Sequence, residues 1–236
     1  MLAVRLIQTD AELEAVGRLR YRVYVEEMAR TQDHADHHAR RIIEPLDEHA
    51  RIFAALDGGD VVGTLRANVG AESDFGCYEA LYDMRALDPY YPRELSITTK
   101  FILAPAYRRT ALVRRFLEIG YAYAIERGVR FDLMDCNSPL LPVFLGAGYR
   151  QVRPNVIHHE YGVVHPLVLV VHDTEHFAAV GSPFAGRPGQ EPSDPSVAFF
   201  RARFGDVATP RGPVHPAGST LPASSPPHRP RAHGST

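Results

Sequence analysis

Apolar residues at the start of the chain follow first the pattern of a strand and then that of a helix. Residues 2–7 (LAVRLI) form a short apolar run typical of a β-strand. Asp10 is a suitable N-cap, and the segment after it has one face of residues at helical spacing. The members of that face are Leu13, Val16, Arg20, Val23 and Tyr24. The sequence therefore predicts one strand followed by one helix.

A β-hairpin is the next regular element. Two apolar runs within residues 51–69 enclose the turn sequence DGGD, a pattern typical of two antiparallel strands joined by a tight turn. The segment before it, residues 30–49, is charged and rich in histidine, and we predict a loop with a short helix there. The segment after it, residues 71–93, is irregular, with one short helix predicted within residues 78–87.

The second half of the chain alternates strands with helices. The predicted elements are, in order, strand 95–103, helix 109–127, strand 129–135, helix 138–148 and strand 165–173. The two helices are expected to end at Gly128 and Gly148. Alternation of strand and helix implies parallel pairing, whereas the earlier hairpin implies antiparallel pairing. The expected fold class is α+β, with a mixed, mostly antiparallel central sheet flanked by helices.

Residues 181–236 differ in composition and are expected to form a C-terminal extension rich in proline and glycine. No acidic residue follows Asp206, and few apolar residues remain to offset the entropy of ordering. We therefore expect the chain to be mostly disordered from about residue 206. A short helix is predicted at residues 196–204 (SVAFFRARF). Residues 1–180 hold the other predicted elements and are expected to form one domain.

Composition excludes several classes of function. The 236 residues carry 26 Lys and Arg against 28 Asp and Glu, a formal net charge of −2, so no overall positive field favours nucleic acid or an anionic membrane. No apolar run has the length that a membrane helix needs, and the N-terminus lacks the pattern of a signal peptide. The two cysteines, Cys77 and Cys136, form no disulfide or zinc motif. We expect a cytoplasmic protein that binds no nucleic acid and has no integral membrane segment.

Motifs between residues 20 and 150 resemble those of one enzyme superfamily. A strand, a Pro-x-Tyr-Arg turn, a long helix ending in Arg-Gly, a strand and a short helix ending in Gly-Tyr resemble the GNAT acyltransferase fold. Four further motifs resemble those of the acyl-homoserine-lactone synthases and the related N-acyl amino acid synthases. They are Arg20-Tyr21-Arg22-Val23-Tyr24, Glu44-x-x-Asp47, Gly63-Thr64-Leu65-Arg66 and Glu94-Leu95-Ser96. The resemblance implies that residues 1–180 form a GNAT-like acyltransferase domain.

For the acyl donor, the resemblance implies a pantetheine thioester, carried by acyl-carrier protein or coenzyme A, and no tightly bound cofactor. In this fold the backbone N–H groups of the central strand hold the pantetheine arm and stabilise the oxyanion. Here these residues are Phe101, Ile102 and Leu103. An apolar channel for the acyl chain is expected between this strand and residues 129–135, with Asn137 as a hydrogen-bonding residue at its edge.

The acceptor amine is expected beside the N-terminal motifs. Arg66 lies in the apolar run VVGTLRANV, and a buried arginine needs a carboxylate partner, for which Glu44 and Asp47 are the candidates. Arg20 and Tyr24 are four residues apart on one helix face, so they either line the acceptor pocket or brace its loop. The alternative for Arg66 is a side chain that points outward from a half-exposed hairpin.

Glu94 is the candidate general base, acting directly or through a water molecule. It precedes the strand expected to line the cleft, where partial burial would make a carboxylate a better base. The alternative is a surface carboxylate at a strand entrance, paired with Arg93 or Lys100.

The turn Arg108-Arg109-Thr110-Ala111 stands where acetyltransferases hold the pyrophosphate of coenzyme A. Its arginines and the helix N-terminus suit a phosphate, but the turn has no glycine to let the backbone approach two phosphates closely. A carrier protein presents a single phosphate and an acidic surface, so we expect acyl-carrier protein to be preferred over coenzyme A. The alternative is an exposed turn with ordinary surface arginines.

Histidines and cysteines are the remaining candidates for chemistry. His34 with His38, and His172 with His176, could share helix faces as metal ligands, but neither segment supplies a further clear ligand. We therefore expect no metal. Cys136 is either a nucleophile that carries an acyl group or a small buried side chain, which is the commoner state of the residue type.

Three functions remain open. The favoured one is an N-acyltransferase that acylates the amine of an amino acid-like small molecule. The second is a non-catalytic acyl-thioester-binding or partner domain, which Phe144 favours because many acetyltransferases have a proton-donating tyrosine at this place. The third is a lactone-forming signal synthase. Ile97 in place of an arginine and Arg30 in place of an aromatic residue argue against it.

Overall fold

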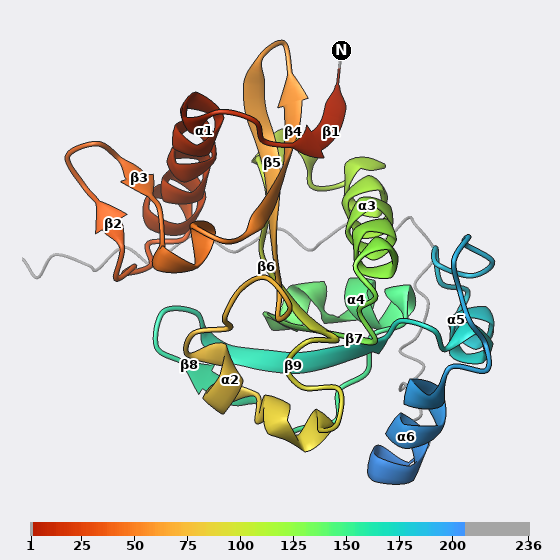
Figure 1. Cartoon of the computed structure of the whole chain (residues 1–236). Coiled ribbons are helices and arrows are strands. Elements are labelled where there is room, and N and C mark those ends of the chain that lie inside the picture. The colour runs from red at the N-terminus through yellow and green to blue at the C-terminus, as the bar shows by residue number, and fades with distance from the viewer. Residues whose placement is uncertain (1, 206–236) are drawn as a thin grey trace, which may run out of the picture.

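Seven strands form the central sheet of the computed structural model, which describes residues 2–205 (Figure 1). In sheet order they are β1 (Ala3–Leu6), β4 (Arg51–Asp57), β5 (Asp60–Val69), β6 (Leu95–Leu103), β7 (Phe131–Cys136), β9 (Gly162–Val170) and β8 (Val156–His158). β6 and β7 are parallel, and the other neighbouring pairs are antiparallel. The expected α+β class with a mixed, mostly antiparallel sheet is confirmed.

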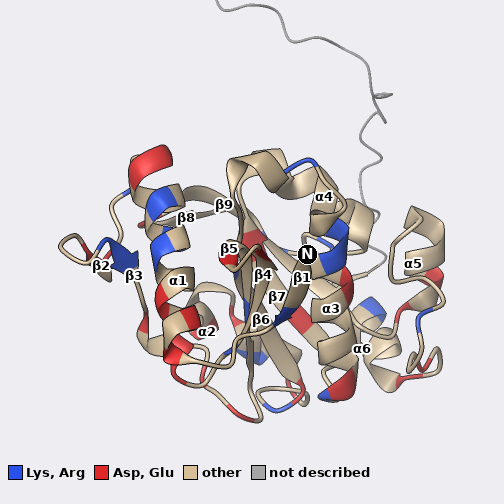
Figure 2. Cartoon of the chain, turned by 90° about the horizontal axis from the view of Figure 1, so that it is seen from above, with Lys and Arg blue, Asp and Glu red and all other residues tan. Residues whose placement is uncertain are grey.

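Helices cover both faces of the sheet (Figure 1). α3 (Leu112–Glu126), α4 (Leu141–Ala147) and α5 (Thr174–Val180) contribute to the core on one face. α1 (Asp10–Tyr21), α2 (Tyr78–Leu81) and α6 (Pro195–Phe204) contribute to the two apolar clusters on the other face. Acidic residues lie in the first turn of α1 and basic residues in its last turn, which suits the helix dipole (Figure 2). No helix within residues 2–205 is long and apolar enough to cross a membrane.

Several element boundaries differ from the expected ones for local reasons. The N-cap of α1 is Thr9, whose side chain accepts the N–H of Glu12 at 3.2 Å, and not Asp10. α3 begins three residues later than predicted, at Leu112. Thr110 holds the preceding residues in a turn, since its hydroxyl donates to the Tyr107 carbonyl and accepts the Leu112 N–H.

Four short elements were not predicted. They are the hairpin β2 (Ala35–Asp36) and β3 (Arg41–Ile42), the strand β8 and the helix α5. Each has seven residues or fewer, too few for a clear period in the sequence. The remaining short segments are 3₁₀ turns at Pro45–Asp47, Met84–Leu87, Pro105–Tyr107 and Ser138–Leu140.

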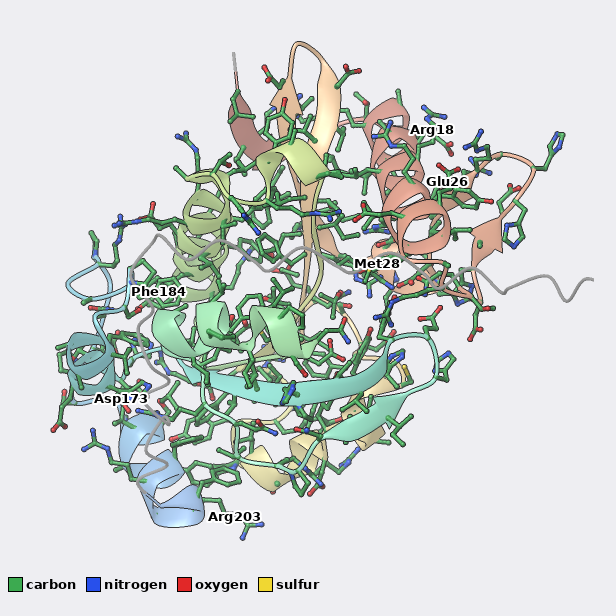
Figure 3. All side chains as sticks on the ribbon, turned by 180° about the vertical axis from the view of Figure 1, so that it is seen from behind. Arg18, Glu26, Met28, Asp173, Phe184 and Arg203 are labelled. Carbon is green, nitrogen blue, oxygen red and sulfur yellow. The ribbon has the colours of Figure 1, made fainter. Side chains whose placement is uncertain are left out.

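Part of the C-terminal extension packs on the rest of the chain. Phe184 stacks on Tyr121 of α3 with ring centroids 4.3 Å apart and planes at 8° (Figure 3). α6 confirms the helix predicted at residues 196–204 and places the buried Phe200 near Phe131 of β7. Residues on both sides of position 180 therefore share one core. The expected disorder from about residue 206 concerns residues outside those described.

The sheet splits at its one parallel pair. The register pairs Leu95 with Phe131 and Ile97 with Leu133 and goes no further, so beyond Ile97 the two strands diverge (Figure 1). The remainder of β6 stays paired with β5. Gly63 of β5 permits this close packing, because a Cβ there would lie 2.6 Å from a Leu103 side-chain atom. The fold thus opens the sheet beside one edge of β6.

β6 also carries a bulge. Between the pairs Thr64–Ile102 and Arg66–Thr99, β6 holds one residue more than β5. Lys100 lies in this bulge and has a positive φ of 52°, a conformation that non-glycine residues adopt rarely and mostly at functional sites.

Candidate functional site

A cleft of about 370 Å³ lies where β6 and β7 diverge. This is the place at which the sequence predicts an apolar channel. The polar lining residues include Tyr24, Tyr78, Thr99, Lys100, Asp135 and Tyr161. The apolar lining residues include Phe101, Leu103, Val113, Met134, Leu140, Val143 and Phe144. The cleft therefore joins a polar end to an apolar end through the opening in the sheet.

A buried group of ion pairs lies behind the polar end. The guanidinium of Arg20 binds both carboxylate oxygens of Asp47, at 2.6 and 3.0 Å. Arg66 reaches Glu44 at 2.6 Å and Asp47 at 3.2 Å, and its Nε donates to Thr99 Oγ1 at 2.8 Å. Both arginine side chains are fully buried. The expectation that Arg66 is buried against Glu44 and Asp47 is confirmed.

Lys100 is a further cation in this group. Its Nζ lies 2.5 Å from Glu44 Oε1 and also donates to the hydroxyl of Tyr161. In a regular strand, Thr99 and Lys100 would point to opposite faces of the sheet. The bulge lets both side chains reach the group formed by Glu44 and Arg66. Among the charged residues of this group, Lys100 lines the cleft, next to Thr99. Arg20 and Arg66 are buried behind Lys100.

The charges of this group are not balanced. Arg20, Arg66 and Lys100 face the carboxylates of Glu44 and Asp47, three cations against two anions. Burial lowers the pKa of Lys100 and outweighs the opposing attraction of Glu44. Burial would raise the pKa of Glu44, but the charges of Lys100 and Arg66 together hold it below its usual value. Arginine does not lose its proton in proteins, so Lys100 is the cation that can become neutral.

Tyr24 and Tyr161 enclose the ammonium group of Lys100. Lys100 Nζ lies 5.4 Å from the ring centroid of Tyr24 and 4.9 Å from that of Tyr161. The predicted helix face continues past α1 as a π-helical segment, η1 (Arg22–Glu27), and this segment brings Tyr24 into the cleft. Burial raises the pKa of both tyrosines, so they are neutral hydroxyl groups at neutral pH. Met28, which also lines the cleft, follows this segment (Figure 3).

The opposite wall provides a half-buried carboxyl group. Asp135 of β7 accepts a hydrogen bond from the hydroxyl of Tyr82, and burial raises its pKa. Asn137 lies at the edge of the cleft, where its Nδ2 donates to the carbonyls of Tyr161 and Val163 at 3.1 and 3.2 Å. The two walls thus differ, with the cation of Lys100 on β6 and the carboxyl group of Asp135 on β7.

The residues expected to bind the donor are only partly brought together. Phe101, Ile102, Leu103, Arg108 and Asn137 line the cleft. Its lining within residues 2–205 does not include Arg109, Thr110 or Ala111, which form the exposed turn before α3. The two terminal nitrogens of the Arg108 guanidinium, Nη1 and Nη2, donate to the carboxylate of Glu27, a residue of η1. This ion pair connects η1 to the turn that follows β6, and both residues line the cleft.

Glu94 lies away from the cleft. It precedes the short stretch in which β6 and β7 are still paired, and it is not among the cleft-lining residues of the described chain. Its carboxylate lies 3.5 Å from the guanidinium of Arg130 and is half exposed. Lys100, suggested as its partner, binds Glu44 instead. The geometry favours the alternative of a surface carboxylate, and a catalytic role for Glu94 stays untested.

We expect Glu94→Gln to keep acyl transfer within about threefold of the wild-type rate, since the change removes a charge outside the cleft and conserves shape. Initial rates of thiol release at several pH values provide the measurement. A hundredfold loss, in the range by which general bases contribute, would restore Glu94 as the base.

Three departures from the related enzymes have structural explanations. Ile97 is fully buried in the core where β6 still pairs with β7, and the cation of the cleft is Lys100, three residues later. Arg30 lies over the ring of Tyr161, 5.7 Å from its centroid, and donates to the Glu160 carbonyl. Phe144 is an apolar wall of the cleft.

The geometry favours neither Cys136 as a nucleophile nor a metal site at the two histidine pairs. Cys136 is buried, and burial raises the pKa of its thiol to about 12, which makes it a poor nucleophile. Within residues 2–205, the one group of three ligand-type side chains close enough to share a metal ion is Asp33, His159 and Glu160. It includes neither histidine pair considered from the sequence.

Lys100, Tyr161 and Asp135 were missed in the sequence. A lysine inside the apolar run SITTKFIL is the same signal that identified Arg66, a charge where a strand is buried. Asp135 stands at the end of an apolar strand, a position typical of site residues. Tyr161 has no local signal, because the hairpin of β8 and β9 brings it to the cleft from a distant part of the chain.

Comparisons with known proteins agree with this geometry. Residues 15–173 match the family model described as N-acyl amino acid synthase FeeM. Among solved structures, FeeM from uncultured soil microbes, an N-acyl amino acid synthase, has a TM-score of 0.56 at 16% identity over 72% of this chain and 92% of that chain. No curated protein sequence matches the chain.

Two acyl-homoserine lactone synthases also have this fold. The coenzyme A-dependent synthase BjaI has a TM-score of 0.58 at 17% identity, over 86% of this chain and 100% of its own. LasI has a TM-score of 0.55 at 13% identity, over 77% of this chain and 96% of its own. At such identities the structures establish a shared fold.

Proposed function

This chain belongs to the family of N-acyl amino acid synthases represented by FeeM, and from that premise we propose that it transfers an acyl group from a pantetheine thioester to the amine of an amino acid. The family is one of acyltransferases. The observation that carries the proposal is the cleft through the split sheet, which joins buried ionisable groups to an apolar space. An amino acid suits the first part and an acyl chain the second.

The edge of β6 suits the donor. Acyl transfer needs N–H groups that stabilise the oxyanion and hold the pantetheine amides. Beyond Ile97, β6 is no longer paired with β7, so this edge of Phe101, Ile102 and Leu103 faces the cleft. A pantetheine arm can add to such an edge as an extra strand does. These three residues therefore line the donor side, and those of their backbone groups that point away from β5 bind the donor.

The unbalanced charge near Lys100 suits the acceptor. A free amino acid brings an ammonium group that must lose a proton before it can attack, and Lys100 in its neutral form can take that proton. The nitrogen then attacks the thioester carbonyl, a C–N bond forms and the C–S bond breaks. The second proton of the attacking nitrogen goes to the leaving thiolate. The carboxylate of the acceptor offsets the positive charge that Lys100 gains with this proton, beside a group in which Arg20 and Arg66 already balance Glu44 and Asp47.

The remaining acceptor-side residues support Lys100. Arg20, Arg66 and Asp47 are buried, so they act by fixing Glu44 and the loop that carries it. Glu44 in turn holds Lys100, and Tyr24 lines the pocket itself. The two arginines and two carboxylates thus lie behind the acceptor site, and Tyr24 and Lys100 contact the substrate.

The function is tested by incubating the pure protein with octanoyl thioesters and a panel of amino acids, and measuring free thiol and product mass. Thiol release that requires an amino acid, with an N-octanoyl amino acid as product, is the expected result. S-adenosylmethionine is included in the panel, because an acyl lactone product would favour the signal-synthase alternative. No thiol release with any pair would contradict the proposal.

Acyl-carrier protein is the donor we expect to be preferred. The turn before α3 has no glycine, and its Arg108 is already paired with Glu27, which leaves little provision for a pyrophosphate. We expect kcat/KM for octanoyl-acyl-carrier protein to exceed that for octanoyl-coenzyme A by about tenfold or more. Octanoyl-pantetheine serves as the control without phosphates. Equal or better use of the coenzyme A thioester, as BjaI's description as coenzyme A-dependent would suggest, would overturn this preference.

A further inference from the structure

Two aromatic rings lie between the cleft and a smaller cavity beside α3. Phe101 of β6 and Phe144 of α4 both line it, with ring centroids 6.0 Å apart and planes at 74°. Phe144 is 2% exposed and is further held by an edge contact with Tyr149, at 5.9 Å. Phe101 is held in the same way by Phe116, at 5.7 Å. The rings are therefore fixed walls of the cleft.

A second, very small cavity lies behind these rings. It has a volume of about 20 Å³, and Phe101, Phe144 and Thr98 line both it and the cleft. Its far side contains Asp132, a buried carboxyl group that accepts hydrogen bonds from Thr98 at 3.0 Å and Tyr149 at 2.5 Å. The space is too small for an alkyl chain, and its polar groups already have partners. A chain that enters from the cleft thus ends at the two rings.

We propose that Phe144, together with Phe101, sets the longest acyl chain that the cleft accepts. The inference rests on the proposed function for the identity of the ligand, an acyl chain, and goes beyond it by assigning the residue that limits chain length. Each methylene buried in an apolar pocket tightens binding by about fourfold. Binding should therefore improve with chain length until the terminal methyl group reaches the rings, and then stop improving.

Phe144 is the better residue to change. Phe101 belongs to the strand whose backbone is proposed to bind the donor, so its replacement could disturb more than the chain pocket. Phe144 also lines the cleft but lies on α4, outside the strand proposed to bind the donor. Phe144→Ala removes this ring and joins the cleft to the small cavity behind it.

The experiment measures binding, so that it does not depend on turnover. A series of S-alkyl pantetheine thioethers from butyl to hexadecyl is titrated calorimetrically into the wild-type protein, Phe144→Ala and Phe177→Ala. Phe177 is the matched control, because it is a fully buried phenylalanine that lines neither the cleft nor the small cavity. We expect the plateau in affinity to move to longer chains in Phe144→Ala alone, with hexadecyl binding about tenfold tighter than in the wild type.

The outcomes separate this inference from the proposed function. An unchanged plateau in Phe144→Ala, or an equal shift in Phe177→Ala, would overturn the role of Phe144. If Phe144→Ala does not fold by circular dichroism, Phe144→Leu replaces it, with a smaller shift in the same direction expected and no shift contradicting the role. Absence of thioether binding by the wild type also overturns the inference. Thiol release by the wild type is measured separately, and its absence alone would contradict the transfer activity and leave the chain-length limit standing.

Discussion

Arg66→Met is expected to destabilise the fold by about 3–5 kcal/mol, the usual result of breaking a buried ion pair. The guanidinium has no solvent exposure and binds Glu44, Asp47 and the hydroxyl of Thr99. Methionine fills similar space but leaves these polar groups with one partner fewer in a site that water does not reach. Since small domains are stable by only about 5–15 kcal/mol, the loss is a large part of the total. Urea denaturation followed by circular dichroism measures it.

Arg18→Met is the matched control. Arg18 lies on α1 and, like Arg66, forms an ion pair. Its guanidinium is exposed, however, and lies 3.9 Å from the carboxylate of Glu14. Exposed pairs of this kind contribute at most about 1 kcal/mol, so this variant should unfold near the wild-type urea concentration. Equal midpoints for Arg66→Met and the wild type would show that the buried group does not stabilise the fold.

The same group makes stability depend on pH. The neighbouring cations hold the pKa of Glu44 and Asp47 below their usual values, against the effect of burial. A carboxyl group with a lower pKa in the folded state stabilises the fold above its unfolded pKa. That contribution is lost as the pH falls through the folded pKa. Arg66→Met should therefore lose less stability than the wild type between neutral and strongly acidic pH.

Arg66 shows what the sequence can predict of this site. A charge inside an apolar strand requires a buried partner, and Glu44 and Asp47 follow from that requirement and the family motif. Lys100 carries the same signal, but the sequence does not show the bulge that turns it toward Glu44. The sequence does not show that Glu94 lies outside the cleft. The cleft opens where β6 leaves β7, and this point depends on long-range strand pairing and not on a local pattern. The fold class was easier to predict, since strand and helix periods are local.

The structure also shows how the charged residues of the N-terminal motifs can act. Arg20 and Arg66 have no exposed surface, so a substrate cannot touch them in this conformation. In the mechanism proposed above, Arg66 acts through Glu44, which binds both Arg66 and Lys100, and Arg20 acts through Asp47. Substitutions in the motifs should therefore lower stability and activity together. A change at Lys100 should instead lower the activity and leave the stability of the fold largely intact.

Lys100→Met is expected to lower kcat/KM for acyl transfer by about 10²–10⁴-fold, the range that a positioned general base contributes. The fold should persist, because Glu44 keeps its contact with Arg66 when Lys100 is removed. The wild-type kcat/KM should rise with pH through the pKa of Lys100, which burial lowers toward neutrality, since only the neutral amine can take a proton. Lys100→Met should lose this pH-dependent rise.

Lys100→Arg distinguishes a base from a fixed positive charge. Arginine keeps the cation beside Glu44 and the rings of Tyr24 and Tyr161, but it does not give up its proton. If Lys100 takes the proton of the acceptor, this variant should be nearly as inactive as Lys100→Met. If it keeps most of the wild-type rate, Lys100 acts through its charge, and Asp135, the half-buried carboxyl group on the other wall, becomes the candidate base. Rates of this variant at several pH values, with urea denaturation to confirm folding, decide between the two, because arginine does not titrate and a rate that still rises with pH would point to Asp135.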